Sequence, residues 1–135
     1  MELPVLRLTP GLTAAITVTV AEEHTAQAVG SGTVRVLATP ELVRLLEQAA
    51  VAAMADLLPA GQTSVGTALE IRHLAPTPVG LTVTARATLK QVDGRQLIFD
   101  VEAHDAVEKI GEGTHTRVLV DHKKFEEKAT SKVRG

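Results

Sequence analysis

The 135-residue sequence has no cysteine, tryptophan or tyrosine, and Phe99 and Phe125 are its only phenylalanines. Without cysteine, the chain can form neither a disulfide framework nor a thiolate nucleophile. Without larger aromatic side chains, it lacks the platforms on which nucleic-acid bases stack. The formal net charge is −2 and the charges are interspersed, unlike the basic surface of a nucleic-acid-binding protein. We therefore expect no nucleic-acid partner.

Long apolar runs are also absent. No segment offers the ~18 uninterrupted apolar residues of a membrane-spanning helix. The N-terminus, MELPVLRLTPGL, lacks the basic segment and long apolar run of a secretory signal peptide. We expect a cytoplasmic protein with no membrane partner. A length of 135 residues fits a single domain over residues 1–135, which ends in a polar tail at residues 122–135.

One long helix is expected from Pro40 to about Leu58. Thr39 is a favoured N-cap residue, and Pro40 suits the first helical position. Apolar side chains recur along the segment at helical spacing, at Leu42, Leu45, Leu46, Ala49, Ala53 and Leu57. The central run AAVAAMA is apolar all round, which predicts a helix enclosed by other elements. Pro59 and Gly61 mark its end.

The remaining sequence is rich in alternating strand patterns. Strands are expected at residues 13–20, 33–37, 63–74, 81–90, 95–107 and 114–121. Asp93-Gly94 predicts a hairpin turn, Gly111 and Gly113 predict another turn, and the tail after Asp121 is expected to fray or form a loose helix. One strand, an enclosed helix and then four strands in a meander predict an α+β fold, with one antiparallel sheet around a central helix. Its open sheet edges favour dimerisation.

Three polar side chains stand where chemistry is possible. Thr39 lies at the N-terminal end of the helix, where free N–H groups can stabilise a developing negative charge. Glu47 lies on an apolar helix flank, which indicates that a second surface, such as another subunit, covers it. His73 ends a strand before a Pro-rich turn and can act as a general base near neutral pH. Taken singly, the three also fit a helix cap, a solvated acid and a surface histidine.

Other kinds of site are not indicated. No histidine pair has metal-ligand spacing with acidic residues. The sequence contains no phosphate-binding loop, dinucleotide-binding motif or serine-hydrolase motif. We therefore expect no metal site and no cofactor.

Together, these features resemble the hot dog-fold acyl-CoA thioesterases, and in particular the fluoroacetyl-CoA thioesterase type. ATPELVRLLEQAA carries Thr39 and Glu47, IRHLAPTPVG carries His73, and VDGRQLIFDVEAHD and IGEGTHTR are similar to the family's later strands. The resemblance implies hydrolysis of a small acyl-CoA thioester to free acid and CoA by a Thr39, Glu47 and His73 set. Whether water or a side chain attacks the thioester stays open. The resemblance also implies a homodimer, with a homotetramer as a further possibility.

The resemblance extends to three further residues. The backbone N–H of Gly66 would face the thioester carbonyl oxygen, and His115 and Arg117 would contact CoA phosphates or support the site. The fluoroacetyl-CoA enzyme has aromatic gate residues before its helix, whereas this chain has no such aromatic before Phe99. A general or different short-chain acyl-CoA is therefore the expected substrate. The alternatives are a non-catalytic acyl-CoA or small-ligand-binding protein of the same fold and, ranked third, a hydratase.

Overall fold

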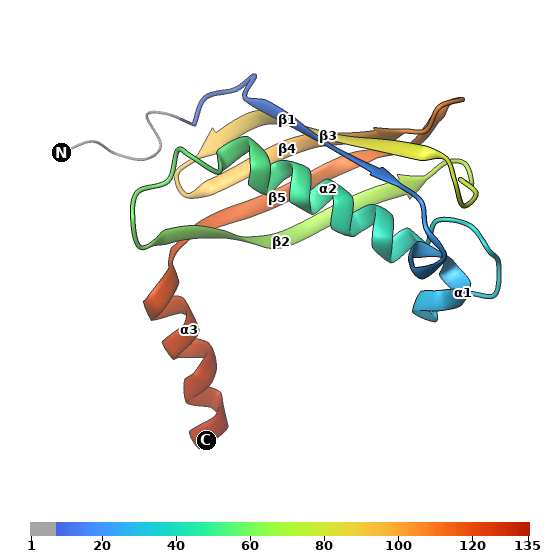
Figure 1. Cartoon of the computed structure of the whole chain (residues 1–135). Coiled ribbons are helices and arrows are strands. Elements are labelled where there is room, and N and C mark those ends of the chain that lie inside the picture. The colour runs from blue at the N-terminus through green and yellow to red at the C-terminus, as the bar shows by residue number, and fades with distance from the viewer. Residues whose placement is uncertain (1–7) are drawn as a thin grey trace.

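The computed structural model describes residues 8–135, so residues 1–7 of the expected domain lie outside the described part. A five-stranded antiparallel sheet carries one long helix across one of its faces (Figure 1), which confirms the predicted α+β fold. In chain order the elements are β1 (Thr13–Thr19), η2 (Glu22–His24), α1 (Ala26–Val29), α2 (Thr39–Met54), β2 (Gln62–His73), β3 (Thr82–Asp93), β4 (Gln96–His104), β5 (Lys109–Asp121), α3 (His122–Thr130) and η3 (Ser131–Arg134).

The strand order in the sheet is β1-β3-β4-β5-β2. Strands β3, β4 and β5 form a meander, but the predicted four-strand meander is wrong because β2 pairs with β5 at the far edge. The segment from β2 to β3 contains Pro76 and Pro78 and crosses the end of the sheet instead of making a tight hairpin (Figure 1). Strand β2 is therefore an edge strand.

Helix α2 and the inner face of the sheet form the core. Leu42, Leu46 and Ala49 are fully buried on the helix, opposite buried β3 and β4 residues that include Val83 and Phe99. This burial confirms the predicted apolar stripe, but the helix is not enclosed all round within this chain, because Val51 in its central run is 46% exposed. Burying one such leucine contributes roughly 1.5–3 kcal/mol, so the stripe holds the helix firmly against the sheet.

The regular part of α2 ends at Met54, earlier than the expected Leu58. Residues 55–58 form turns instead. Leu58 precedes Pro59, and a residue in that position is sterically disfavoured in the helical conformation. Pro59 therefore disfavours the helical conformation at the preceding residue as well as at its own position.

The expected turn at Gly111 and Gly113 is wrong, because both residues lie inside β5. A Cβ atom on Gly113 would lie 1.9 Å from the carbonyl oxygen of Glu70 on β2, and one on Gly111 would lie 2.8 Å from the Leu42 side chain. These glycines let neighbouring backbone and the helix approach closely. The strand needs them for packing.

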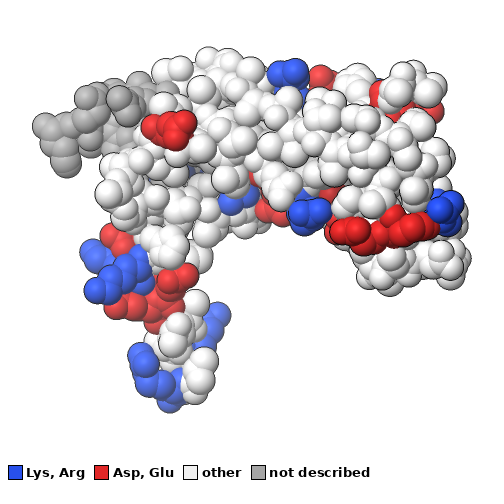
Figure 2. Space-filling view, in the orientation of Figure 1, with Lys and Arg blue, Asp and Glu red and all other residues white. Residues whose placement is uncertain are grey.

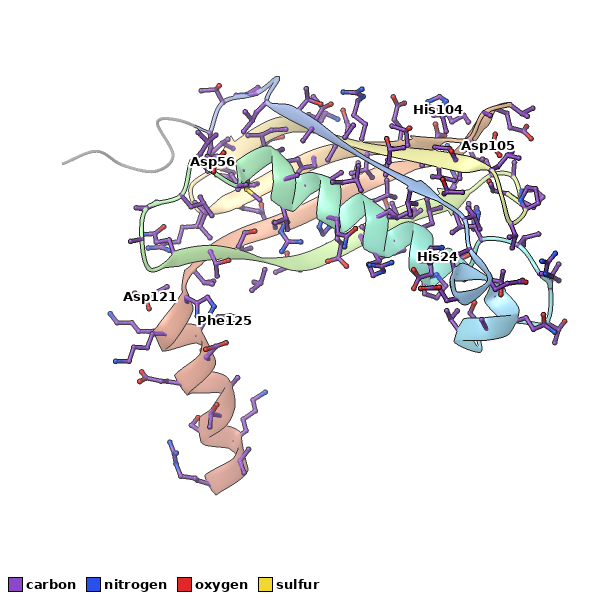
Figure 3. The ribbon with its side chains drawn as sticks, viewed as in Figure 1. His24, Asp56, His104, Asp105, Asp121 and Phe125 are labelled. Carbon is purple, nitrogen blue, oxygen red and sulfur yellow. The ribbon has the colours of Figure 1, made fainter. Side chains whose placement is uncertain are left out.

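The turn between β4 and β5 lies instead just after His104. The Asp105 carboxylate accepts hydrogen bonds from the backbone N–H groups of Val107 and Glu108, at 2.8 and 2.9 Å. Its second oxygen accepts the hydroxyl of the fully buried Thr77 at 2.9 Å. Figure 3 shows Asp105 and His104 at this end of the sheet. The turn is thereby tied to the loop that follows β2.

The short strand expected at residues 33–37 is also wrong. The segment makes only isolated bridges, from Leu37 to Thr25 and from Val36 to Pro78. Residues 33–35 are bent and exposed. It forms an open loop before α2.

The polar tail forms helix α3, which agrees with the helix that was one of its two expected states, the other being a frayed end. The Asp121 carboxylate caps the helix by accepting the Lys124 backbone N–H at 2.9 Å. Every residue of α3 is exposed, and the helix extends away from the sheet with Phe125 near its start (Figures 1 and 3). Figure 2 shows acidic and basic groups gathered on α3.

Within residues 8–135, none of the helices is both long enough and apolar enough to span a membrane. The cytoplasmic location stays a prediction.

Candidate active site

The N-terminus of α2 meets the end of β2 at a Thr39–His73 pair. Two backbone hydrogen bonds fix the chain before the helix, from the Leu37 N–H to the Thr77 carbonyl and from the Ala38 N–H to the His24 carbonyl, at 2.8 and 2.9 Å. Thr39 Oγ1 then lies 2.8 Å from His73 Nδ1. The sheet and the helix start thus place a hydroxyl and an imidazole in hydrogen-bond contact.

The predicted capping role of Thr39 is wrong. Ala38 is the N-cap residue, with extended backbone and no side-chain capping bond, and Thr39 is the first residue of the helix. The backbone N–H groups of Glu41 and Leu42 both bond to the Ala38 carbonyl at 3.0 Å. The Thr39 hydroxyl is therefore directed to His73 instead of to its own helix.

Burial lowers the pKa of His73 below its ordinary value of 6.5, because a charged imidazole loses hydration there. Its Nε2 atom is buried and has no hydrogen-bond partner among residues 8–135. A neutral imidazole whose Nδ1 accepts the Thr39 hydroxyl proton carries its own proton on Nε2. The pair therefore has the geometry of a nucleophile and its base, with one ring nitrogen left for a further partner.

An open pocket of about 400 Å³ lies at this pair. Its walls come from the loop before α2 and from the segment after β2, with mostly small side chains: Ala26, Ser31, Gly32, Thr33, Val34, Val36, Leu37, Thr39, His73, Leu74, Ala75 and Pro76. The volume lies within the range of small-molecule sites. The loop that fails to form a strand thus forms one wall of the candidate site.

Glu47 belongs to a second cluster, two turns along α2. Its Oε2 lies 3.4 Å from Arg117 Nη1 and 3.9 Å from His115 Nε2. The side chain of Glu47 stays 43% exposed. Gly66 lies against the same carboxylate, since a Cβ atom there would be 2.7 Å from Oε2. The carboxylate on the apolar flank therefore has a partner within its own chain.

His115 and Arg117 are buried, at 1% and 7% exposure. Arg117 Nε donates to Ser64 Oγ at 2.8 Å, and Nη2 donates to the Ser64 carbonyl at 3.0 Å. Nη1 lies 3.1 Å from His115 Nε2 as well as near Glu47. Each guanidinium nitrogen thus has a partner inside the chain, which favours the supporting role over contact with CoA phosphates.

Burial also lowers the pKa of Arg117, an effect that the Glu47 carboxylate opposes. Burial likewise lowers the pKa of His115 below 6.5, helped by the positive charge of Arg117 and opposed by the Ala68 carbonyl and by Glu47. His115 is therefore neutral near pH 7.

Sequence reasoning missed Ser64 as a functional residue. The available signal was the alternation of β5, in which the inward positions 115 and 117 hold polar residues while the inward position 119 holds a leucine. Buried polar groups need partners, so the facing strand had to supply an oxygen.

The two clusters do not meet as one triad in a single chain. Eight residues separate Thr39 from Glu47 on the helix, which is about 12 Å along its axis at 1.5 Å per residue. Within residues 8–135, no hydrogen bond joins Glu47 to Thr39 or to His73. The same part of the chain holds no group of three or more His, Cys, Asp or Glu residues suited to a metal ion.

Comparison with known proteins identifies the family. The sequence profile of the fluoroacetyl-CoA-specific thioesterases matches residues 20–123. The chain belongs to this family. It is 48% identical over 97 residues to the fluoroacetyl-CoA thioesterase of Streptantibioticus cattleyicolor, which covers 72% of this chain and 70% of that protein. Membership of the family confirms a thioester hydrolase that acts on acyl-CoA thioesters.

Solved structures agree with the family and the fold. A fluoroacetyl-CoA thioesterase structure superposes with a TM-score of 0.87 at 38% identity, over 92% of this chain and 96% of that one. A thioesterase superfamily member from Thermus thermophilus gives a TM-score of 0.87 at 26% identity, over 93% of both chains. A hot-dog-like protein from Thermanaerovibrio acidaminovorans gives 0.83 at 24% identity, over 91% of both chains. These likenesses confirm the predicted hot dog fold.

Proposed function

We propose that this thioesterase hydrolyses short-chain acyl-CoA esters at the Thr39–His73 pair. The observation that carries the proposal is the 2.8 Å contact between Thr39 Oγ1 and His73 Nδ1 beside an open pocket. The buried Nε2 of His73, which has no partner among residues 8–135, supports it further. An unpaired buried polar atom is costly unless a ligand, water or another chain completes it.

In the proposed reaction, His73 accepts the hydroxyl proton as Thr39 attacks the thioester carbonyl carbon. The C–S bond breaks, His73 gives the proton to the leaving sulfur, and CoA departs as the free thiol, which leaves His73 neutral. Water then attacks the acyl-threonine, and His73 takes its proton and returns one to Thr39 as the free acid leaves. The lowered pKa of His73 supports this role, because the neutral imidazole is the form that accepts a proton.

Glu47 and Gly66 complete the proposed site from the second cluster. The half-exposed Glu47 carboxylate would orient water or substrate, and the exposed Gly66 would offer its backbone N–H to the thioester oxygen. The buried His115 and Arg117 would hold the Glu47 carboxylate in position through its Oε2 atom. In the predicted set of Thr39, Glu47 and His73, His73 contacts Thr39, whereas Glu47 lies two helical turns away within one chain.

We further propose a homodimer formed along β2. This strand is 12 residues long and, among residues 8–135, has no strand paired on its outer side. A second copy related by a two-fold axis would pair with it antiparallel and satisfy its free backbone groups. Gly66 lies on β2 against the Glu47 side chain of α2, and His73 ends β2. The two copies would therefore enclose the CoA ester between them.

The pocket favours an acyl group that is not restricted to fluoroacetyl. The side chains that line it are small apart from Leu37, His73 and Leu74, and its loop carries no aromatic residue. Acetyl-, propionyl- and butyryl-CoA are therefore the first substrates to test beside fluoroacetyl-CoA.

The test is free-thiol release from this panel of CoA esters by the wild-type protein and by Thr39→Ala and His73→Ala. We expect thiol release by the wild type and a loss of at least 100-fold in both variants. Binding of the esters without thiol release would support the non-catalytic alternative. Full rates in both variants would show that the pair is not the reacting centre.

A further inference from the structure

Strand β5 carries a buried polar pair beside Glu47 whose arrangement the proposed reaction does not explain. His115 and Arg117 occupy alternate inward positions of this strand, where the next inward residue, Leu119, is apolar. A buried arginine is costly unless all of its charge is paired and hydrogen-bonded. The position of the pair therefore needs an explanation beyond packing.

The tautomer of His115 follows from its contacts. Its Nδ1 lies 2.9 Å from the Ala68 carbonyl oxygen, which can only accept, so Nδ1 carries the proton. In the neutral ring Nε2 is then an acceptor, and it receives the hydrogen bond from Arg117 Nη1 at 3.1 Å. His115 thus directs one end of the guanidinium.

The bulge in β2 supplies the Ala68 acceptor. The register against β5 shifts between Gly66 and Ala68, so Thr67 has no paired residue on β5. A bulge re-aims the groups beside it, and here the Ala68 carbonyl serves the His115 ring. The irregularity in β2 therefore has a specific role in holding the pair.

Ser64 directs the other end of the guanidinium. Its hydroxyl and its carbonyl accept from Arg117 Nε and Nη2 at 2.8 and 3.0 Å. Held at both ends, Arg117 presents Nη1 to Glu47 Oε2 across Gly66. The absence of a Cβ atom at position 66 makes that approach possible.

We propose that Ser64 and His115 are positioning residues, which fix Arg117 so that it orients the Glu47 carboxylate of the proposed thioesterase site. Arg117 Nη1 contacts Oε2 at 3.4 Å, while the Glu47 side chain stays 43% exposed. The inference rests on the proposed function for its effect on turnover, but the geometry that it describes can be measured without substrate.

The kinetic test uses Ser64→Ala, the conservative rescue Ser64→Thr, and Thr63→Ala as the matched control on the opposite face of β2. We expect Ser64→Ala to lower kcat about tenfold with KM within about twofold, because one hydrogen bond to a charged group is lost. Ser64→Thr should restore most of kcat, and Thr63→Ala should leave it unchanged. An unchanged kcat in Ser64→Ala would overturn the proposal.

A double-variant cycle separates positioning from general damage. In a Glu47→Gln background, Ser64→Ala should cause little further loss of kcat, because its effect passes through the carboxylate. An equal fold-loss in both backgrounds would show that Ser64 acts only on stability or elsewhere in the site.

A substrate-free measurement keeps this inference distinct from the proposed function. In the wild type, ¹⁵N NMR should show His115 as the neutral Nδ1–H tautomer. Ser64→Ala should shift the His115 Nε2 and the Glu47 carboxyl ¹³C resonances, whereas Thr63→Ala should not. Unmoved resonances would overturn the positioning role, while absence of thiol release with moved resonances would overturn only the proposed function.

Discussion

The two polar clusters along α2 differ in how completely their groups are bonded. The Thr39–His73 pair has one internal hydrogen bond, an open pocket beside it, and a His73 Nε2 atom without a partner in the described part of the chain. In the Glu47 cluster, every nitrogen of Arg117 has a partner. A sparsely bonded pair can exchange partners during a reaction, whereas a fully bonded network is rigid. The comparison supports our proposal that the first cluster reacts and that the second cluster supports it.

The strongest test of this comparison removes the reacting pair. We expect His73→Ala and Thr39→Ala to lower kcat roughly 10²–10⁴-fold, with thiol release as the measurement. Stability should change by less than about 0.5 kcal/mol in Thr39→Ala, because Thr39 is exposed and makes no helix cap. Thr39→Ser, which keeps the hydroxyl, is the control. A large loss of stability in Thr39→Ala would restore the capping interpretation.

A methyl group at position 66 disturbs only the Glu47 cluster, so we expect a smaller loss of kcat than in the variants of the Thr39–His73 pair. In Gly66→Ala the new Cβ would lie 2.7 Å from Glu47 Oε2 and 3.0 Å from the His115 ring, so the carboxylate must move. We expect kcat to fall about tenfold. Gly111→Ala is the counterpart, since the nearest neighbours of its Cβ would be the Leu42 side chain and the Arg72 carbonyl. It should lower stability and leave kcat within about twofold.

The rigidity of the support can be tested through Arg117→Lys. A single ammonium group cannot satisfy Ser64, His115 and Glu47 at once, so we expect a loss of about 1–3 kcal/mol in the free energy of urea unfolding. Arg44→Lys is the control, because Arg44 pairs with Glu41 while its side chain is half exposed. It should cost less than about 0.5 kcal/mol. Equal losses of unfolding free energy in the two variants would show that the buried hydrogen bonds of Arg117 stabilise the protein no more than the exposed Arg44–Glu41 pair does.

The smallest expected effect is a dependence of stability on pH. The pKa values of His73 and His115 are both lowered from 6.5 by burial, so the unfolded chain binds protons at a higher pH than the folded protein. Stability is then complete above about pH 6.5 and falls as the pH drops toward the lowered values. Urea unfolding at pH 7.5 and 5.5 measures this decrease. It should shrink in the His73→Asn, His115→Asn double variant.

Local patterns predicted most of the fold. The alternation in β1, β3 and β4 and the apolar stripe of α2 each depend on a period that side-chain direction imposes on the backbone, and all four elements are observed. The local errors fell on Gly111, Gly113, residues 33–37 and the last turn of the helix, and the topological error was the place of β2 in the sheet. A glycine that permits close packing and a glycine that permits a turn look the same in a sequence.

The resemblance grouped Thr39, Glu47 and His73 as one catalytic set, and that role stays a prediction. In the structure Thr39 contacts His73 and does not cap its helix. Glu47 lies with Gly66, His115 and Arg117, away from that pair. Ser64 was missed because a serine in a strand has no local signal for the arginine that it meets 53 residues later.

The sequence by itself determined which segments form the helix and most of the strands, and which stripe of the helix is buried, because these properties depend on neighbours a few residues apart. The tertiary structure decided that β2 crosses to the sheet edge and which polar groups pair. It placed Ser64 under Arg117 and His73 against Thr39. These contacts join residues far apart in the chain, and only packing of the whole sheet against α2 fixes their distances.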